Sequence, residues 1–393
     1  MVSNEISKLE LIQARISFIP EGWKLDKVGE ALNIKNNFRK PISQEVRSLI
    51  PGPYPYYGPT KIQDHIADYE QDGIYALIGE DGDHFLKYET MRQTQFISGK
   101  CTVNNHAHII ESSDTCDSEW FYIYFQYRNI TNFLSRQGAG RFKLNKATLE
   151  KLPLLVPPLP EQQKIAKILS TWDQAISTTE RLIDNSTQQK KALMQQLLTG
   201  KKRLLDDSGK RFEGEWEEGK LADFAKIKKG KALSSKDLKE GSYPVIAGGK
   251  SSPYTHSDFT HENVITVSAS GAYAGYVAYF DYRIWASDCS VLEPKGDNNI
   301  KYLYYWLSNQ QQKIYTLQSG GAQPHIYPRD LESMKISIPS CIEQQKIATV
   351  LTNADKEIEL LEQQLVDLQQ EKKALMQVLL TGKKRVVVKG EFA

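Results

Sequence analysis

Two long stretches of the chain carry apolar residues with the period of a helix that packs along another helix. In the second stretch the apolar positions recur alternately every four and three residues: Ile347, Leu351, Ala354, Ile358, Leu361, Leu365, Leu368, Leu375 and Leu379, with Lys372 in the same series. The first stretch follows the same rule through Ile165, Leu169, Trp172, Ile176, Thr179, Ile183, Ser186, Lys190, Leu193 and Leu197. No Pro or Gly interrupts either until Gly200 and Gly382, which stand where a C-cap glycine is typical. The pattern predicts two helices of about 38 residues, each spanning roughly 57 Å.

These two stretches belong to an internal repeat. The segment EQQKIAKILSTWDQAI from Glu161 returns at Glu343 as EQQKIATVLTNADKEI, an offset of 182 residues. Of the 43 positions from Glu161 to Arg203, 24 are identical to those from Glu343 to Arg385. The repeat suggests that the two tails have the same function and bind the same kind of partner.

The repeat extends upstream with less identity. The glycine-rich residues 138–140 fall on 320–322 at the same offset, whereas Tyr54-Pro55 and Gly82 fall on Tyr243-Pro244 and Gly271 at an offset of 189. This difference implies about seven extra residues in the first copy, between Gly82 and Trp120. Two fronts that share a skeleton and differ in surface residues suggest two domains for different targets; an old duplication that has drifted is the alternative.

We therefore predict a tandem repeat of mixed α/β (α+β) domains. The predicted order is a first domain (1–159), a first long helix (160–203), a second domain (204–341), a second long helix (342–385) and a tail (386–393). If the halves are related by a pseudo-twofold axis, the helices pack as an antiparallel coiled coil and place the domains at opposite ends. A helix pair buried for stability alone remains an alternative. At the matching seam positions, we expect Lys190 and Lys372 to extend toward solvent or to set the register.

Composition narrows the class of protein only slightly. The 393 residues are 40% hydrophobic and 25% charged, with a net charge of +2, so any nucleic-acid-binding surface has to be local. The four cysteines form no CxxC pair, which favours a reducing cytoplasm. Neither a signal peptide nor a membrane-spanning apolar run is recognised.

At this point the chain resembles a known family. The phrases PLPEQQKIAKIL and QQKKALMQQLLTGKKR, repeated after a second variable region, are similar to the specificity subunit of type I restriction–modification systems. YPYYGPTKIQDHIADY (54–69), GKCTVNNHAHII (99–110) and SASGAYAGYV (268–277) resemble its target-recognition domains. The first tail departs from the second by having Thr179 and Ser186 where the second has Leu361 and Leu368, which suggests a weaker or more partner-dependent coiled coil.

The resemblance implies a non-catalytic, DNA-binding subunit. In such a protein each domain reads one half of an asymmetric, split site on double-stranded DNA, and the helices set the unread spacer between the halves. The subunit recruits two methyltransferase subunits and then restriction–translocation subunits. S-adenosylmethionine, ATP and Mg²⁺ are expected on those partners, not on this chain.

Basic and forked polar side chains are the candidates for contacting DNA, because they suit phosphates and base edges. In the first domain these are Lys35, Arg39, Arg47 and Lys61, together with Gln137 and Arg141 in a glycine-rich loop. In the second domain they are Lys228, Lys229, Lys231 and Lys250, together with Gln323 in the matching loop. Asn104, Asn105, His106 and His108 form a polar cluster for which we favour a structural role over a metal site.

Motifs of catalysis are not recognised in the sequence. Gly249-Lys250-Ser251 ends like a phosphate-binding loop, but Pro244 stands where its first glycine is needed. Three functions remain open: a type I specificity subunit, a specificity chain serving a fused nuclease–methyltransferase of type IIB, and a coiled-coil scaffold that binds no DNA.

Overall fold

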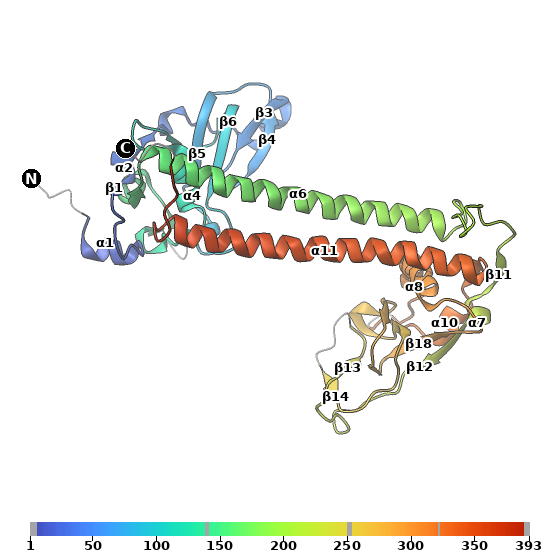
Figure 1. Cartoon of the computed structure of the whole chain (residues 1–393). Helices are drawn as coiled ribbons and strands as arrows, with labels where there is room; N and C mark the ends of the chain where they lie inside the picture. Colours follow the sequence, from blue (N-terminus) through green and yellow to red (C-terminus); the bar gives the residue numbers. More distant parts are fainter. Residues whose placement is uncertain (1–5, 138–140, 250–253, 321–322, 389–393) are drawn as a thin grey trace, which may run out of the picture. The chain divides into compact units, whose positions relative to one another are not determined.

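The computed structural model describes residues 6–137, 141–249, 254–320 and 323–388, and describes only the backbone of Arg136, Gln137 and Arg141. The chain forms two compact units (Figure 1): unit 1 is Met1–Thr178 with Leu365–Ala393, and unit 2 is Thr179–Gln364. Unit 1 holds the start of the long helix α6 (Leu159–Leu197) and the end of the long helix α11 (Cys341–Leu379). Unit 2 holds the end of α6 and the start of α11. The linear domain boundaries given above stay a prediction.

Unit 1 is built on a six-stranded sheet. Its strand order is β2 (Asn33–Ile34), β7 (Ala107–Glu111), β5 (Gln71–Gly79), β6 (Thr94–Val103), β3 (Pro51–Tyr57) and β4 (Ile62–Ile66), and all neighbours are antiparallel except β6 and β3. Two small sheets pair β1 (Lys24–Lys27) with β10 (Pro153–Val156) and β8 (Ser135–Gln137) with β9 (Arg141–Lys143). The short helices are α1 (Lys8–Gln13), α2 (Val28–Ala31), α3 (Gln44–Leu49), α4 (Ser118–Phe125) and α5 (Lys146–Lys151), with 3-10 turns η1 (Asn36–Phe38), η2 (Asp83–Phe85) and η3 (Thr131–Phe133).

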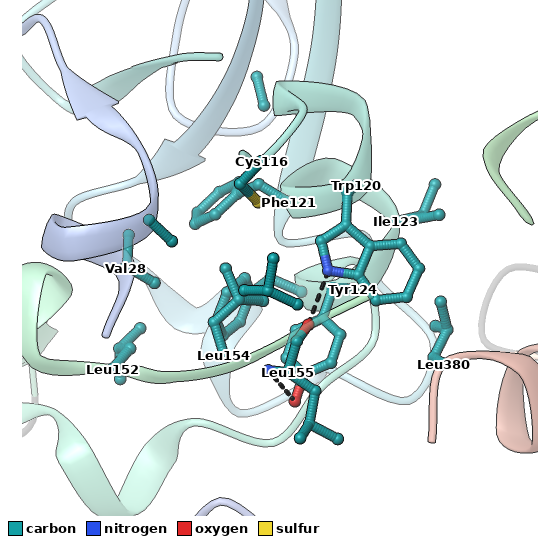
Figure 2. Packing of buried hydrophobic residues seen from close by; sticks show 14 of the residues in the cluster. Val28, Cys116, Trp120, Phe121, Ile123, Tyr124, Leu152, Leu154, Leu155 and Leu380 are labelled. Atoms are coloured by element: carbon teal, nitrogen blue, oxygen red, sulfur yellow. Dashed lines mark hydrogen bonds between the residues drawn. The ribbon is translucent and has the colours of Figure 1, made fainter. Parts of the chain in front are cut away.

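The core of unit 1 joins the domain to both long helices (Figure 2). Trp120 of α4 is fully buried, and its Nε1 donates a hydrogen bond to the Leu155 carbonyl at 2.8 Å. The same cluster contains Ile165 of α6 and Leu380, which follows α11. Domain and helix ends therefore share one hydrophobic core, so the helices are not an appendage on an independent domain.

Unit 2 repeats this plan with smaller sheets. One sheet has the order β12 (Ala225–Lys229), β18 (Cys289–Pro294), β15 (Val264–Ser268) and β16 (Val277–Phe280); another has the order β14 (Thr255–His256), β13 (Tyr243–Ile246) and β17 (Trp285–Ala286). A third pairs β11 (Glu217–Lys220) with β19 (Lys335–Ile338). The helices are α7 (Leu221–Phe224), α8 (Ile300–Asn309), α9 (Gln311–Thr316) and α10 (Pro328–Glu332), with the 3-10 turn η4 (Gly271–Tyr273). The core again includes residues of both long helices, among them Leu197 and Ile347.

The strand registers show that the two domains are repeats residue by residue. Gly79 faces Ala107 in unit 1, and Ser268 faces Cys289 in unit 2. Other strand pairs correspond in the same way. Lys24↔Val156 in unit 1 corresponds to Glu217↔Ile338 in unit 2, and Tyr56↔Thr102 corresponds to Val245↔Trp285. The prediction of two tandem α/β (α+β) domains is confirmed.

The long helices form because nothing in their sequences stops them before the glycines. Pro160 lies in the first turn of α6, where its missing N–H costs no intrahelical bond. Gly200 and Gly382 follow the helix ends with φ of +71° and +66°. A side chain at Gly382 would also collide with Pro20, since its Cβ would lie 2.2 Å from Pro20 Cγ. The C-terminus of each long helix is capped by an equivalent backbone hydrogen bond. Lys202 N donates to Gln196 O after α6, and Lys384 N donates to Val378 O after α11, both at 3.1 Å.

The seam residues of both helices are buried or half-buried along their whole length. Thr179, which interrupts the apolar series of α6, is itself buried, and Ser186 donates to Glu357 Oε1 at 3.3 Å. Within each unit the two helices are antiparallel. In unit 1, Asp173 pairs with Lys372 and the earlier residue Glu161 pairs with the later residue Arg385.

A buried carboxylate in the first turn of each long helix joins it to the far end of the other. Glu161 accepts from Arg385 Nε and Nη2, both at 2.7 Å, and from Trp23 Nε1 at 3.0 Å. Glu343 accepts from Arg203 Nε and Nη2, both at 2.7 Å. Each arginine also lies over a tryptophan ring near the start of its domain. Arg385 lies 5.8 Å from the Trp23 ring centre, and Arg203 lies 5.8 Å from that of Trp216. The equivalent residues of the two tails therefore form equivalent ion pairs, each with a buried carboxylate.

The next residue of the repeat anchors the domain. The Gln162 side chain accepts from Asp117 N and donates to Thr115 O and Pro157 O. The Gln344 side chain accepts from Asn299 N and donates to Pro339 O. Asp117 and Asn299 are the N-caps of α4 and α8, so this glutamine binds the aromatic helix of its domain to the long helix.

Of the two expectations for the seam lysines, the structure agrees with a role in setting the register and not with an extension toward solvent. Lys372 is buried and pairs with Asp173 at 2.7 Å; burial lowers the pKa of its ammonium despite that carboxylate. Lys190 pairs with Asp355, whose other carboxylate oxygen accepts from Tyr305 Oη at 2.6 Å. Both lysines are held in ion pairs between the helices, which a solvent-directed chain would not form.

Replacing Arg385 with alanine would leave the Glu161 carboxylate buried and without its charged partner. We expect a loss of about 3 kcal/mol of unfolding free energy. For a unit of this size that loss corresponds to roughly 6–12 °C in the melting temperature. Differential scanning calorimetry measures it, and Lys383→Ala, a nearby exposed lysine, is the control. Equal melting temperatures for the two variants would show that the ion pair does not stabilise unit 1.

Candidate nucleic-acid interface

Four chain segments gather at one end of the unit 1 sheet. They are the β3–β4 turn (58–61), the start of the β5–β6 loop (80–82), the β6–β7 turn (104–106) and the described parts of the β8–β9 hairpin (135–137 and 141–143); we call them the first loop cluster. Glu80 N donates to His106 O, and Leu144 N donates to Glu80 O, both at 2.8 Å. Asn104 Nδ2 donates to Gln63 Oε1 of β4 at 3.1 Å. Backbone hydrogen bonds thus fix loops from distant parts of the domain.

Charged side chains are paired inside this cluster. Glu80 accepts from Arg39 at 2.7 Å and pairs with Lys143 at 3.2 Å. Burial alone would raise the pKa of the Glu80 carboxyl, but the hydrogen bond from Arg39 and the nearby cations outweigh it and lower that pKa. His106 Nδ1 lies 3.2 Å from Asp81 Oδ2 at the surface. The cluster presents an ordered set of polar groups on a rigid base.

Unit 2 contains an equivalent second loop cluster, formed by residues 247–249, 269–271, 287–288, 319–320 and 323–325. Ala269 N donates to Asp288 O at 3.1 Å, and Ile326 N donates to Ala269 O at 2.9 Å. The bridge Ser270↔His325 corresponds to Asp81↔Lys143 in unit 1. The two clusters therefore share one backbone scaffold and differ in their side chains.

Four of the predicted DNA-binding residues, Lys61, Gln137, Arg141 and Gln323, lie in these clusters. Lys61 is exposed in the β3–β4 turn, and the equivalent Lys250 lies outside the described residues. Gln323 is exposed, and its equivalent Arg141 opens β9; the side chains of Arg141 and Gln137 lie outside the described part of the chain. For all of these the DNA contact stays a prediction.

The other predicted positions lie on edge strands or within the domain. Lys35 follows β2 and pairs with Glu111 at 3.2 Å. Lys228 is its equivalent in unit 2 and is exposed on β12 beside Lys229. Lys231 lies over the Trp285 ring at 5.0 Å.

Arg39 and Arg47 are engaged by their own domain. Arg39 donates to Asn36 O, Asn105 O and Glu80 Oε2. Arg47 donates to Ile42 O at 2.6 Å and to Asp64 Oδ2 at 3.4 Å, and lies over the Tyr56 ring. These contacts give both arginines a structural role in the domain, and their contact with DNA stays a prediction.

The side chains of Asp81, Ser270 and Asp288 were absent from the sequence-based candidates, and His106 was assigned a structural role. The signal that could have found them is positional: they fall on equivalent points of the repeat. Asp81 corresponds to Ser270 at an offset of 189 and His106 to Asp288 at an offset of 182, and the strand registers show which offset applies to each strand. Across residues 6–137, 141–249, 254–320 and 323–388, no group of three or more His, Cys, Asp or Glu is placed to hold a metal ion.

The first domain has a longer β5–β6 loop, which explains most of the extra residues seen in the sequence. Six of them lie between Gly82 and Gln93, where η2 forms. The His84 ring fills the space under this loop, since a Cβ at Gly79 would come within 2.6 Å of it. Burial lowers the pKa of His84 to about 4, although Asp81 and Asp83 act in the opposite direction.

His84 gives the first domain a specific dependence on pH. Between pH 6.5 and 4 the unfolded chain binds a proton on this residue that the folded chain excludes, so stability falls as pH falls, by about 1.4 kcal/mol per pH unit. We expect the wild type to lose about 2 kcal/mol more than His84→Gln between pH 7 and pH 5. Urea unfolding of the two proteins at both pH values measures this difference, and parallel losses would contradict it.

Comparison with known proteins assigns the family. The model of the type I restriction modification DNA specificity domain matches the chain twice, over residues 20–185 and 213–370. The chain therefore belongs to the family of type I restriction–modification specificity proteins, as its resemblance predicted.

Relatives of similar length carry the same description. A putative type I restriction enzyme specificity subunit of Haemophilus influenzae is 29% identical over 348 residues, covering 84% of this chain and 86% of the relative. The type I restriction enzyme MjaVIII specificity subunit of Methanocaldococcus jannaschii is 25% identical over 403 residues, covering 94% of each. The crystal structure of a type I restriction–modification S subunit from M. genitalium shares the fold, with a TM-score of 0.68 and 16% identity over 92% of this chain and 96% of that one. None of the helices in the described ranges is long and apolar enough to cross a membrane.

Proposed function

We propose that this chain reads a split DNA target, with each domain binding one half-site on double-stranded DNA. The observation that carries the proposal is the pair of loop clusters, which have the same hydrogen-bonded backbone and different polar side chains. A shared scaffold suits the same duplex geometry, whereas different side chains suit different base edges. Exposed lysines near them, such as Lys61 and Lys228, supply phosphate contacts.

The long helices set the unread spacer between the half-sites. Each is unbroken over 39 residues. Their shared seam and four ion pairs resist sliding of one helix along the other. The separation of the half-sites on DNA then follows from helix length, because each heptad adds about 10 Å, or roughly three base pairs.

Inserting one heptad into both helices, at Thr179 and at Leu361, keeps the seam in phase. We expect the spacer to widen by about three base pairs while both half-sites stay unchanged. Mapping of methylated positions in cells that carry the variant and its methyltransferase partner measures this outcome. A two-residue insertion, which rotates the rest of the helix by about 200° and turns its seam away from the partner helix, is the control and should abolish activity. An unchanged spacer contradicts the helix-length proposal, and a wild-type complex without sequence preference contradicts DNA reading itself.

Recruitment of two methyltransferase subunits fits an exposed stripe that occurs once on each helix. The stripe is Gln188, Lys191, Ala192 and Gln195 on α6, and Gln370, Lys373, Ala374 and Gln377 on α11. These positions lie three and four residues apart and so share one face. All four are identical between the copies, whereas exposed positions in the middle of the helices differ, for example Gln174 and Lys356. Identical residues at buried positions are explained by the helix seam. Identical residues at exposed positions favour one kind of partner that binds once to each helix.

Charge reversal in the stripe tests the docking surface without changing the hydrophobic core, because Lys191 and Lys373 are exposed. We expect Lys191→Glu to reduce the bound methyltransferase from two copies to one, and Lys191→Glu with Lys373→Glu to remove both. Lys356→Glu, an exposed site outside the stripe, is the matched control. The mass of the copurified complex by light scattering gives the count. Two partners retained by the double variant would exclude the stripe as the docking surface.

In this proposal the chain has no catalytic role and works in the cytoplasm. S-adenosylmethionine is used by the methyltransferase subunits, and ATP and Mg²⁺ are used by the restriction–translocation subunits that join later. The chain contributes position: it holds the partners on DNA at a distance fixed by its helices.

A further inference from the structure

Two side-chain pairs occupy equivalent places in the loop clusters. In unit 1 the pair is Asp81 and His106, and in unit 2 it is Ser270 and Asp288. Three features of the backbone make them equivalent. Glu80 N→His106 O corresponds to Ala269 N→Asp288 O, Leu144 N→Glu80 O corresponds to Ile326 N→Ala269 O, and the bridge Asp81↔Lys143 corresponds to Ser270↔His325.

In each pair one side chain supports the other. His106 Nδ1 contacts Asp81 Oδ2, and Ser270 Oγ donates a hydrogen bond to Asp288 Oδ2. The His106 side chain is about half exposed. Within the described part of the chain, His106 Nε2 and Asp288 Oδ1 have no hydrogen-bond partner of their own. Each pair thus holds one polar atom in a fixed place without satisfying it.

The chemistry of the two atoms differs. An ionised carboxylate only accepts hydrogen bonds, so Asp288 selects a base that presents an amino group in the major groove, either cytosine N4 or adenine N6. A histidine whose Nδ1 is held by a carboxylate presents Nε2 in a tautomer that the carboxylate sets. The same backbone position is therefore occupied by an obligate acceptor in one domain and by an imidazole in the other.

We infer that Asp81–His106 and Ser270–Asp288 are the corresponding specificity-determining pairs of the two domains, and that Asp288 reads a cytosine or adenine amino group in the second half-site. The inference rests on the proposed function, since it assigns residues within the same DNA-reading surface. It adds a correspondence between the domains: a pair moved from one cluster to the other carries its base preference with it.

The test selects bound duplexes from DNA randomised in both half-sites, using the full complex with its methyltransferase partner. Asp288→Asn keeps the shape and one acceptor but adds a competing donor. We expect the preference for an amino-bearing base at one position of the second half-site to fall by about 5- to 150-fold, the worth of one base contact. The first half-site should be unchanged and serves as the internal control. Retention of the full preference at every position of the second half-site overturns the inference.

A double exchange tests the correspondence directly. Asp81→Ser with His106→Asp places the unit 2 pair on the unit 1 scaffold, and we expect one position of the first half-site to change toward cytosine or adenine. If Asp288→Asn abolishes all preference in the second half-site, Ser270→Ala decides the matter. Weakening at the same single position supports the inference, whereas general loss shows that the pair only holds the loops and overturns it. A wild-type complex that selects no sequence at all would instead contradict the proposed function.

Discussion

The register of the whole chain depends on a carboxylate buried in the first turn of each long helix. Glu161 and Glu343 are almost completely buried, and each is neutralised by an arginine that follows the end of the other helix. A buried charge without its partner costs several kcal/mol, so the two helices of each unit are restricted to the one alignment that brings the arginine to it. The neighbouring glutamine binds the N-terminus of the domain's aromatic helix. One dipeptide, Glu-Gln, therefore fixes both the helix register and the attachment of the domain.

This arrangement gives a physical reason for the repeat. The tails are alike because each has to supply a carboxylate, an aspartate, a lysine and an arginine at fixed spacing, and each ion pair takes one residue from each tail. A change in one tail would need a matching change in the other. The loop clusters differ in this respect, because their side-chain pairs, such as Glu80–Arg39, lie within one domain and need no matching change in the other. The tails therefore stay similar because their side chains pair with one another, and the domains diverge because the pairs of each loop cluster stay within its own domain.

The sequence alone was sufficient for the features that local patterns encode. The two helices follow from their 4–3 apolar spacing and their C-terminal glycines, and the tandem domains follow from the repeat. The ion pairs were not predicted, because Glu161 and Arg385 are 224 residues apart and Glu343 and Arg203 are 140 apart. Charge by itself was also insufficient: Arg39 and Arg47 are DNA-binding candidates in the sequence, and the structure adds the contacts that both make within their domain, while their contact with DNA stays a prediction. Sequence shows that a side chain is charged, and only the fold shows what neutralises it.

The internal pairing of these arginines also bears on how a chain with a net charge of only +2 would bind DNA in the proposed function. Arg39 and Arg47 are paired within their domain, so in the proposed function exposed lysines such as Lys61 and Lys228 make the phosphate contacts. Each such contact releases counterions, so the change of affinity with salt concentration depends on how many of these lysines reach the DNA backbone. In the proposed complex this chain supplies base discrimination and spacing with a net charge close to zero. A nearly neutral subunit suits this role, because strong non-specific attraction to DNA would dilute the preference set by its loops.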